Sequence, residues 1–206
     1  MLITISRQFM AGGEPVAKKI ADALGWEVVD DAFADAIAAK SGYSKEDVQS
    51  LEESVPTFLE RFAQSSALSF PEFLVSTPTA MDEPDSVKLA HISREFVEEL
   101  SRRDRVVMVG RAAAAILARE KEALHIRLVA SRDYRIELTE KEHGLSKEKA
   151  AELLDDRDTN RAKYHKELYG RDWNDPLHYH MVLNTELIGP DGASDLVVAQ
   201  ARSLGW

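Results

Sequence analysis

The first 25 residues contain a strand-like run, a turn with two adjacent glycines and an amphipathic helical pattern, in that order. Residues 2–6 (LITIS) are rich in β-branched side chains, which favours a buried strand. After the turn at residues 6–14, three apolar residues recur at intervals of four, namely Val16, Ile20 and Leu24. Gly25 follows them as a stop signal for a helix with one buried face. Because glycines allow close backbone approach and the N–H groups at a helix start favour an anion, this opening predicts a strand–turn–helix unit able to hold a phosphate.

Strand-like and helix-like segments alternate along the rest of the chain. Four more short apolar runs indicate strands, at residues 26–30, 105–109, 124–130 and 180–184. Helical patterns accompany them, at residues 32–62, 89–100, 112–118, 134–143, 146–164 and 195–203. This alternation predicts an α/β fold in which five parallel strands form a sheet with helices on both faces. Ligands of such folds bind beyond the carboxyl ends of the strands, so the segments that directly follow the strands are the candidates for a site.

The composition is that of an ordinary globular protein. A length of 206 residues favours one domain, or one domain with an insertion, and 44% hydrophobic residues suffice for a sizeable core. The sequence lacks an apolar stretch of the roughly 20 residues needed to cross a bilayer. It also contains no cysteine, and its N-terminus has neither the basic region nor the apolar run of a signal peptide. We therefore expect a cytoplasmic protein with no membrane partner.

The formal net charge of −10 argues against a nucleic-acid partner, because binding to a phosphate backbone needs a broad basic surface. A small anionic ligand is still compatible with this charge. A local cluster of arginines can focus a positive field inside a cleft even on an acidic protein.

The turn at residues 6–14 departs from the P-loop pattern GxxxxGK[ST]. Arg7 takes the place of the first glycine, whereas Gly12 keeps the second. Gly13 stands where the lysine belongs, and Glu14 stands where a serine or threonine would hold magnesium. On this segment alone, a phosphate site and a plain strand–turn–helix corner, with Glu14 well placed in the first helical turn, are both open interpretations.

Arginines follow two of the expected strands. Gly110-Arg111 comes directly after the strand at 105–109, and this position favours a guanidinium that points into the ligand crevice over an ordinary surface arginine. Arg132 and Arg135 come after the strand at 124–130. Farther along, Asp158 and Arg161 are three residues apart and Arg157 and Arg161 four apart, so both pairs share a helix face. This last set could grip a phosphate and a polar base, or it could belong to an exposed helix with many salt bridges.

Taken together, three segments of the chain resemble the cytidylate-kinase-like family of P-loop nucleoside monophosphate kinase relatives. The first is ISRQFMAGGEPVAKKIADALG, which is similar to an opening of this family that also lacks the Walker lysine. The second is VVMVGRAAAAIL. The third, DDRDTNRAKYHKELYGRDWNDPLHYHMVLNTELIG, resembles a closing stretch in which an Asp-x-x-Arg helix leads to a strand ending in Asn-Thr. The three segments span most of the chain and are specific jointly and in this order.

The resemblance implies a fold and cofactors. It implies a single P-loop kinase-like domain over residues 1–206, with a P-loop NTPase-like three-layer α/β/α architecture and a central five-stranded parallel sheet. A helical substrate-binding insertion and loop would occupy about residues 32–86, and a lid with charged helices about residues 132–171. ATP and Mg²⁺ are the cofactors that the resemblance implies, and the partner would be a small-molecule nucleotide.

The resemblance also implies roles for particular residues. The backbone around the phosphate loop would cradle the donor phosphates, and the residues concerned are Ala11, Gly12, Gly13 and Glu14. Glu14 could also hold Mg²⁺. The positive charge that lysine normally supplies would come from an arginine, with Arg7, Arg132, Arg135 and Arg157 as candidates. The acceptor would be bound by Gly110, Arg111, Asp158 and Arg161.

At two of these segments the chain departs from the pattern of true cytidylate kinases. Ala112 replaces the aspartate that follows Gly-Arg, and Leu154 replaces the first arginine of the motif that contains Asp158. Three hypotheses follow. The chain is an ATP-dependent kinase of a nucleoside monophosphate or similar acceptor, a catalytically inactive nucleotide-binding regulatory protein, or an interaction scaffold, such as a homodimer, whose pocket no longer binds nucleotides.

Overall fold

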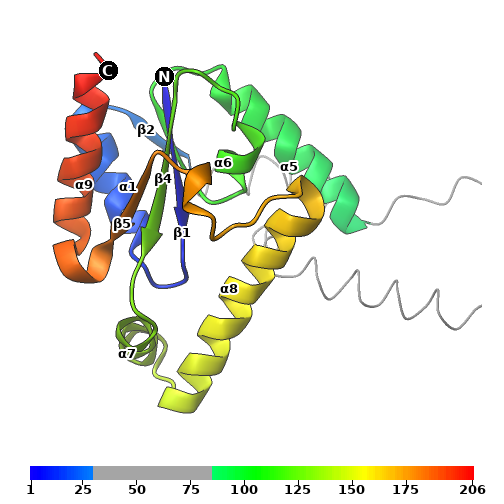
Figure 1. Ribbon diagram of the computed structural model, residues 1–206, viewed down its shortest axis with the longest axis vertical. Helices are drawn as coiled ribbons and strands as arrows, with labels where there is room; N and C mark the ends of the chain where they lie inside the picture. Colours follow the sequence, from blue (N-terminus) through cyan, green and yellow to red (C-terminus); the bar gives the residue numbers. More distant parts are fainter. Residues whose placement is uncertain (30–84) are drawn as a thin grey trace, which may run out of the picture.

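The structure is a computed structural model that describes residues 1–29 and 85–206, with side chains from residue 90 onward in the second range. Figure 1 colours it from the N-terminus in blue to the C-terminus in red. The helical pattern expected at residues 32–62 lies outside the described residues. So does the insertion expected at about residues 32–86, apart from its last two residues.

Five strands of the described residues form one parallel sheet, as the sequence predicts, and their order is β2-β3-β1-β4-β5. The strands are β1 (Leu2–Arg7), β2 (Glu27–Val29), β3 (Val106–Val109), β4 (Ala123–Val129) and β5 (Met181–Asn184). The first strand lies at the centre, where Leu2 aligns with Val106 on one side and with Ala123 on the other. Strand β5 forms one edge of the sheet.

Helices cover both faces of this sheet, which gives three layers (Figure 1). On one face lie α1 (Gly13–Leu24) and α9 (Thr185–Ser203). On the other lie α5 (Asp85–Ser101), α6 (Ala113–Ile116) and α8 (Lys147–Tyr169). Helix α7 (Arg132–His143) lies beyond the end of β4, and a short 3₁₀ turn, η1 (Pro176–His178), precedes β5.

The two faces bury alternate residues of the same strand. Leu2 packs into the cluster that contains Val97 of α5 and Tyr164 of α8. The next residue, Ile3, packs into the cluster that contains Ile20 of α1 and Val197 of α9, and its side chain is fully buried. Burial on both faces explains why the three central strands, β1, β3 and β4, appear as continuous apolar runs.

Several helix boundaries differ from those that the sequence predicts, and three of them lie near the candidate site or the last strand. Helix α6 is shorter than residues 112–118, because Gly110, Arg111 and Ala112 all have positive φ and the helix cannot begin before Ala113. Helix α8 continues past residue 164 to Tyr169. The last helical segment begins at Thr185 and not at residue 195, since a break at Gly189 separates a first turn from the rest.

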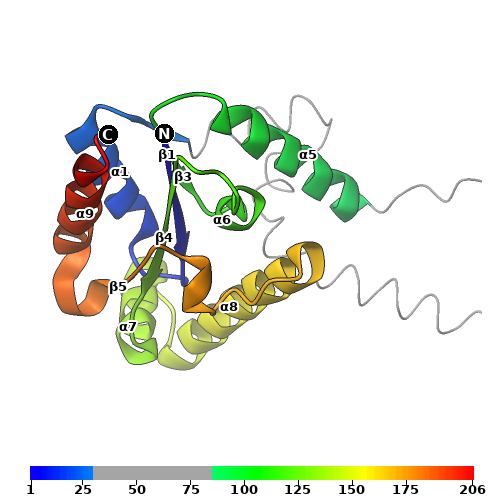
Figure 2. The same ribbon diagram turned by 45° about the horizontal axis from the view of Figure 1, so that its top comes forward.

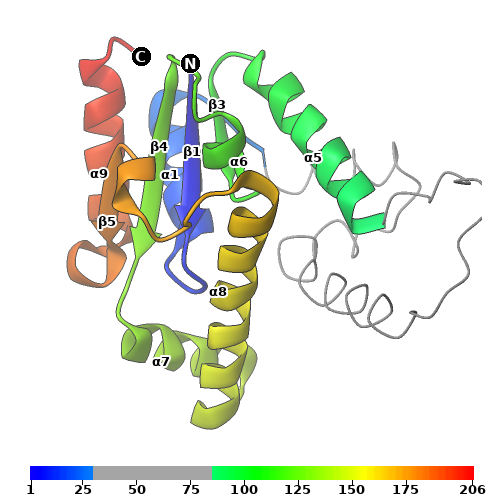
Figure 3. The ribbon, with the colours of Figure 1, turned by 45° about the vertical axis from the view of Figure 1, so that its right-hand side comes forward.

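The carboxyl ends of the strands bring distant segments together. The loop after β1 lies beside α8, and the turn after β3 leads to α6, as Figure 3 shows. The two chain termini lie at the opposite, amino end of the sheet (Figure 2). No helix among the described residues combines the length and the apolar character needed to cross a membrane.

Candidate functional site

The backbone is left-handed at two residues of the loop between β1 and α1. Met10 has φ 62° and Gly12 has φ 77°, and Gly12 is the N-cap of α1. A glycine meets this left-handed requirement without strain, and it has no side chain with which to cap the first N–H groups of the helix. The loop therefore presents the N-terminus of a twelve-residue helix, the feature that the sequence predicts for a phosphate site.

Contacts from neighbouring elements fix this loop in place. The backbone N–H of Gln8 donates to the carbonyl of Leu128, and its side-chain oxygen accepts from the N–H of Ala130 at 3.1 Å. On the other side, the buried hydroxyl of Thr185 lies 3.1 Å from the carbonyl oxygen of Ala11 and 3.3 Å from that of Val129. The loop is thus joined both to β4 and to the first residue of α9.

The side chain of Arg7 crosses the start of α1 at Gly13. A Cβ atom added to Gly13 would lie 2.9 Å from Cγ of Arg7, closer than such atoms pack, and 3.2 Å from Cδ, which is a tight contact. Gly13 is itself buried. The position that would carry the Walker lysine is therefore already covered by the stem of an arginine from the end of β1.

A cavity of about 430 Å³ opens above this loop, within the range of small-molecule sites. One wall is the loop itself, from Arg7 to Pro15. The facing walls come from α7, α8 and the start of α9, and they include Tyr134, Leu138, His143, Arg161 and Pro190.

A second, much smaller cavity lies on the other side of Arg7. It measures about 10 Å³, the room of one water molecule, and its lining includes Gly110, Ala112 and Trp173. Arg7 and Arg161 line both cavities. These two residues therefore lie between the cavity over the phosphate loop and the turn after β3.

The turn after β3 is strained. Gly110, Arg111 and Ala112 have φ values of 69°, 56° and 50° in succession, and two of these residues are not glycine. Left-handed residues other than glycine cost about 1–3 kcal/mol each and persist where the surroundings hold them. The strain therefore coincides with the segment in which the sequence predicts acceptor binding.

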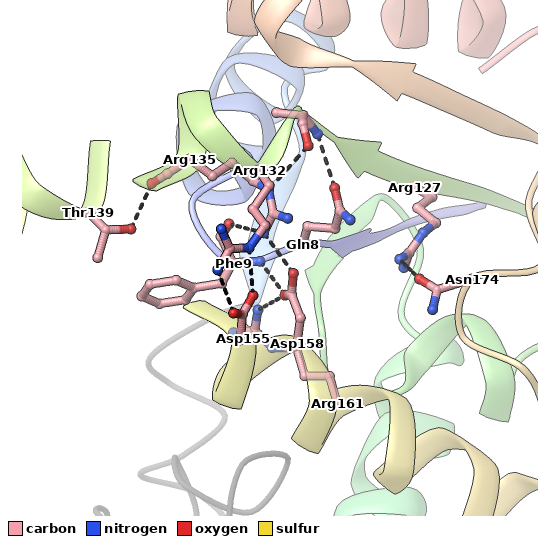
Figure 4. A network of polar contacts seen from close by, with 11 residues as sticks. Gln8, Phe9, Arg127, Arg132, Arg135, Thr139, Asp155, Asp158, Arg161 and Asn174 are labelled. Carbon is pink, nitrogen blue, oxygen red and sulfur yellow. Dashed lines mark hydrogen bonds and ion pairs between the residues drawn. The ribbon is translucent and has the colours of Figure 1, made fainter. Parts of the chain in front are cut away.

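The other predicted site arginines have different environments, and Figure 4 shows those of Arg132 and Arg135. Arg135 is buried and donates to the carboxylate of Asp158 at 2.7 Å. Arg132 is half exposed and forms a two-fold ion pair with Asp155, at 3.0 and 2.6 Å. The pKa of Arg157 is lowered by partial burial in α8. None of Arg132, Arg135 and Arg157 is among the described residues that line the two cavities.

Arg127 is a buried arginine that the sequence did not single out. Its guanidinium lies 4.0 Å from the ring centre of Trp173 and donates to Asn174 at 2.7 Å and to Ser6 at 3.3 Å. Burial, the main cause, lowers the pKa of Arg127 from its ordinary value. The indole N–H of Trp173 also donates to the Ser6 hydroxyl, at 2.9 Å. An arginine is unusual inside an apolar strand, and this feature of the sequence could have identified Arg127 as a candidate.

Glu14 is an exposed residue in the first turn of α1, and it lines the larger cavity. Within residues 1–29 and 85–206, no three His, Asp or Glu side chains gather in a way that could hold a metal ion. One carboxylate nevertheless fits Mg²⁺, because this ion takes one or two carboxylates from a protein and its other ligands from phosphates and water.

Known proteins share this sequence pattern and fold. A sequence model of the Cytidylate kinase-like family matches residues 2–187. A protein named cytidylate kinase from Thermoplasma volcanium is 27% identical over 200 residues, which covers 96% of this chain and 90% of that protein.

Two solved structures resemble the fold over nearly their whole length. An uncharacterized protein from Eubacterium ventriosum matches with a TM-score of 0.70 and 18% identity, covering 98% of this chain and 99% of that one. A shikimate kinase from Bacteroides thetaiotaomicron matches with a TM-score of 0.58 and 12% identity, covering 98% of each chain. At such identities the structures establish the fold alone, a three-layer α/β/α fold of the P-loop kinase type.

Proposed function

Because the chain belongs to the cytidylate kinase-like family, we propose that it transfers a phosphoryl group from ATP to a nucleoside monophosphate or a similar small acceptor. The observation that carries this proposal is the position of Arg7 and Arg161, which line both the cavity over the phosphate loop and the small cavity beside Gly110. A phosphoryl group that moves between donor and acceptor needs positive charge on its path.

The donor would occupy the larger cavity. Its phosphates would lie at the N-terminus of α1, against the backbone of residues 11–14, where the helix dipole favours negative charge. The base would lie toward Tyr134 and Pro190, on the far walls of the cavity. Bound Mg²⁺, held by Glu14, would neutralise charge on the donor phosphates.

Arg7 is the best replacement for the missing lysine. The Cγ and Cδ atoms of Arg7 lie against Gly13. The arginine side chain therefore occupies the space in which a lysine at position 13 would begin. An acceptor oxygen would attack the terminal phosphorus, the bond to the bridging oxygen would break, and ADP would leave with the electrons of that bond. Arg7 and Arg161 would stabilise the negative charge that spreads over the transferred group.

The acceptor would lie on the side of β3. Gly110 lines the small cavity, and Arg111 follows it in a strained turn. A cytoplasmic location and a homodimer both stay predictions from the sequence.

A second candidate function is nucleotide binding without transfer. It is favoured by one specific observation, which is that Gly13 and Glu14 replace the lysine and the hydroxyl of the usual P-loop. Arginine and lysine are not equivalent at such a site, since arginine is a planar fork and lysine a compact point charge.

The test combines binding with turnover. With ATP and Mg²⁺ at about 100 times the dissociation constant, the free energy of unfolding should rise by about 2.7 kcal/mol, and the melting temperature should rise with it. ADP release should then accelerate in the presence of one or more of CMP, dCMP, UMP and AMP. A stable complex with no acceptor-dependent ADP release would support the second function. The absence of any thermal shift at millimolar nucleotide would contradict both.

A further inference from the structure

Asp158, in the middle of α8, reaches two other elements with its two carboxylate oxygens (Figure 4). Oδ1 accepts a hydrogen bond of 2.7 Å from the backbone N–H of Phe9. Oδ2 accepts a hydrogen bond of 2.7 Å from Nη1 of Arg135, on α7. Only 18% of the Asp158 side chain is exposed, and only 5% of the Arg135 side chain. Both contacts are charge-assisted and short, which makes them strong for protein hydrogen bonds.

Arg135 completes a clamp on the same loop residue. Its Nη1 also donates to the carbonyl of Phe9, at 3.1 Å, while its Nε donates to the carbonyl of Ala130, at 3.2 Å. The N–H and the C=O of Phe9 are therefore held by the two members of one ion pair. The Phe9 ring is packed as well, since it stacks on His143 with 6.1 Å between ring centres.

The clamped residue controls the shape of the phosphate loop. Phe9 directly precedes Met10, whose φ of 62° is unfavourable for a residue with a side chain. Met10 leads into residues 11–14, whose N–H groups would face the donor phosphates. If the peptide groups of Phe9 were released, Met10 could return to an ordinary φ, and those N–H groups would change direction.

Asp158 is separate from the cavities themselves. It is not among the described residues that line either cavity, whereas Arg161, nearly one helical turn later, lines both. The distance between Arg161 Nη1 and Asp158 Oδ1 is 3.9 Å, so the carboxylate also lies near the guanidinium that reaches the cavities.

We propose that Asp158 is a positioning residue that clamps the phosphate loop to α7 and α8, and that it does not read the base of the acceptor. This inference rests on the proposed function, and it replaces the acceptor-binding role that the sequence resemblance implies for Asp158. It also extends that function, because the loop, and with it the donor site, depends on an ion pair between the two helices of the expected lid. Acceptor selectivity must then come from other residues.

The main variants are Asp158→Ala and Asp158→Asn. The alanine removes both contacts, whereas the asparagine keeps an oxygen for the Phe9 N–H and loses the charge that pairs with Arg135. Asp155→Asn is the matched control, because Asp155 pairs with Arg132 between the same two helices but at an exposed site with no contact to the loop.

Three measurements are expected to move together. In the Asp158→Ala variant, amide hydrogen exchange of residues 8–14 should accelerate at least ten-fold, and the affinity for ATP with Mg²⁺ should fall at least ten-fold. The KM for ATP should rise for every acceptor by the same factor, so the ratios of kcat/KM between CMP, UMP and AMP should stay unchanged. Asp158→Asn should give an intermediate effect, and Asp155→Asn should leave exchange in the loop as it is in the parent.

A changed ratio between acceptors, with ATP affinity and loop exchange as in the parent, would show that Asp158 reads the base and would overturn the proposal. If Asp158→Ala does not fold, Arg135→Lys provides the same test from the other side. A lysine has a single nitrogen, which cannot occupy the positions of both Nε, bonded to Ala130, and Nη1, bonded to Phe9 and Asp158. Loop exchange and ATP binding need no turnover. A protein that transfers no phosphate would therefore contradict the proposed function, while an unchanged loop in Asp158→Ala would contradict the clamp.

Discussion

The turn after β3 places an arginine in a left-handed conformation beside the proposed acceptor site. Arg111 has φ 56° and lies between Gly110 and Ala112, which are left-handed as well. A glycine would adopt the same φ without steric strain. At this position the backbone conformation therefore favours glycine, whereas the proposed acceptor site requires the arginine side chain.

Arg111→Gly should separate stability from acceptor binding. Relief of the strain is offset by the greater freedom of glycine in the unfolded chain, so the free energy of unfolding should stay within about 1 kcal/mol of the parent. Loss of a charged hydrogen bond, about 1.5–3 kcal/mol, should raise the KM for the acceptor about ten-fold or more. Urea unfolding and initial rates measure the two effects. An unchanged KM for the acceptor would remove Arg111 from the site.

The sequence predicted which residues of the candidate site share a helix face, but not what they contact. Asp158 and Arg161 do lie on one face of α8, as a spacing of three requires. One partner of Asp158 is the backbone N–H of Phe9, which no side-chain pattern encodes. Arg127 was missed for a related reason, since two of its partners, Trp173 and Asn174, come from the irregular segment before η1.

At the scale of elements, the connection from β1 to α1 is held by four others. Strand β4 and helix α9 bond it through Gln8 and Thr185, and helices α7 and α8 clamp it at Phe9. Within the connection, Arg7 at the end of β1 packs on Gly13 at the start of α1. The side chain of Arg7 can therefore take this position only because residue 13 is a glycine.

This dependence predicts a compensating pair of substitutions. Arg7→Ala should lower kcat roughly 30- to 1000-fold, the range for loss of one group that stabilises transition-state charge. Gly13→Lys alone should also lower it, because its Cβ would meet Cγ of Arg7 at 2.9 Å. The double variant has room for the lysine, and its kcat should be at least ten-fold higher than that of either single variant. Steady-state rates measure this coupling.

Lys18→Ala, on the exposed side of α1, is the control and should keep the parent rate. Losses that simply add in the double variant would mean that Arg7 does not take the role of the lysine.

Most of the elements could be predicted from their apolar patterns, because the three central strands β1, β3 and β4 are buried on both faces and most helices have one apolar side. All five strands appear where the sequence places them, to within a residue or two. The start of α9 could not be predicted. Gly189 and Pro190 suggest a loop, yet the turn before them is helical and is capped by Asn184, whose side chain accepts from the N–H of Glu186.

At the scale of the whole molecule, one buried histidine should make stability depend on pH. The Leu117 carbonyl can only accept, so Nε2 of His125 donates to it and Nδ1 accepts from the Thr4 hydroxyl, at 3.2 and 2.8 Å. Burial, with a contribution from nearby His180, lowers the pKa of His125 to about 4. The folded protein therefore excludes a proton that the unfolded chain binds below its ordinary pKa of about 6.5.

The free energy of unfolding should fall as the pH falls from about 6.5 toward 4, because the unfolded state binds more protons in that window. His125 alone should account for about 2 kcal/mol between pH 7.5 and pH 5. His125→Gln should have a lower free energy of unfolding than the parent at pH 7.5, but this free energy should fall less between pH 7.5 and pH 5. Urea unfolding at several pH values would measure both effects. His91→Gln, at an exposed position of α5, is the control. An equal slope in His125→Gln and the parent would contradict the assignment.

The central place of β1 also sets the order of events at the ribosome. Its two neighbours in the sheet are residues 106–109 and 123–129, both in the second half of the chain. At roughly 5–20 residues per second, the nascent β1 waits several seconds or longer before a partner strand emerges. During that wait its apolar side chains have no native sheet to join. The arrival of β3 and β4 is therefore the event that permits the sheet to assemble, and chaperones that shield the first strand until then would have their main task here.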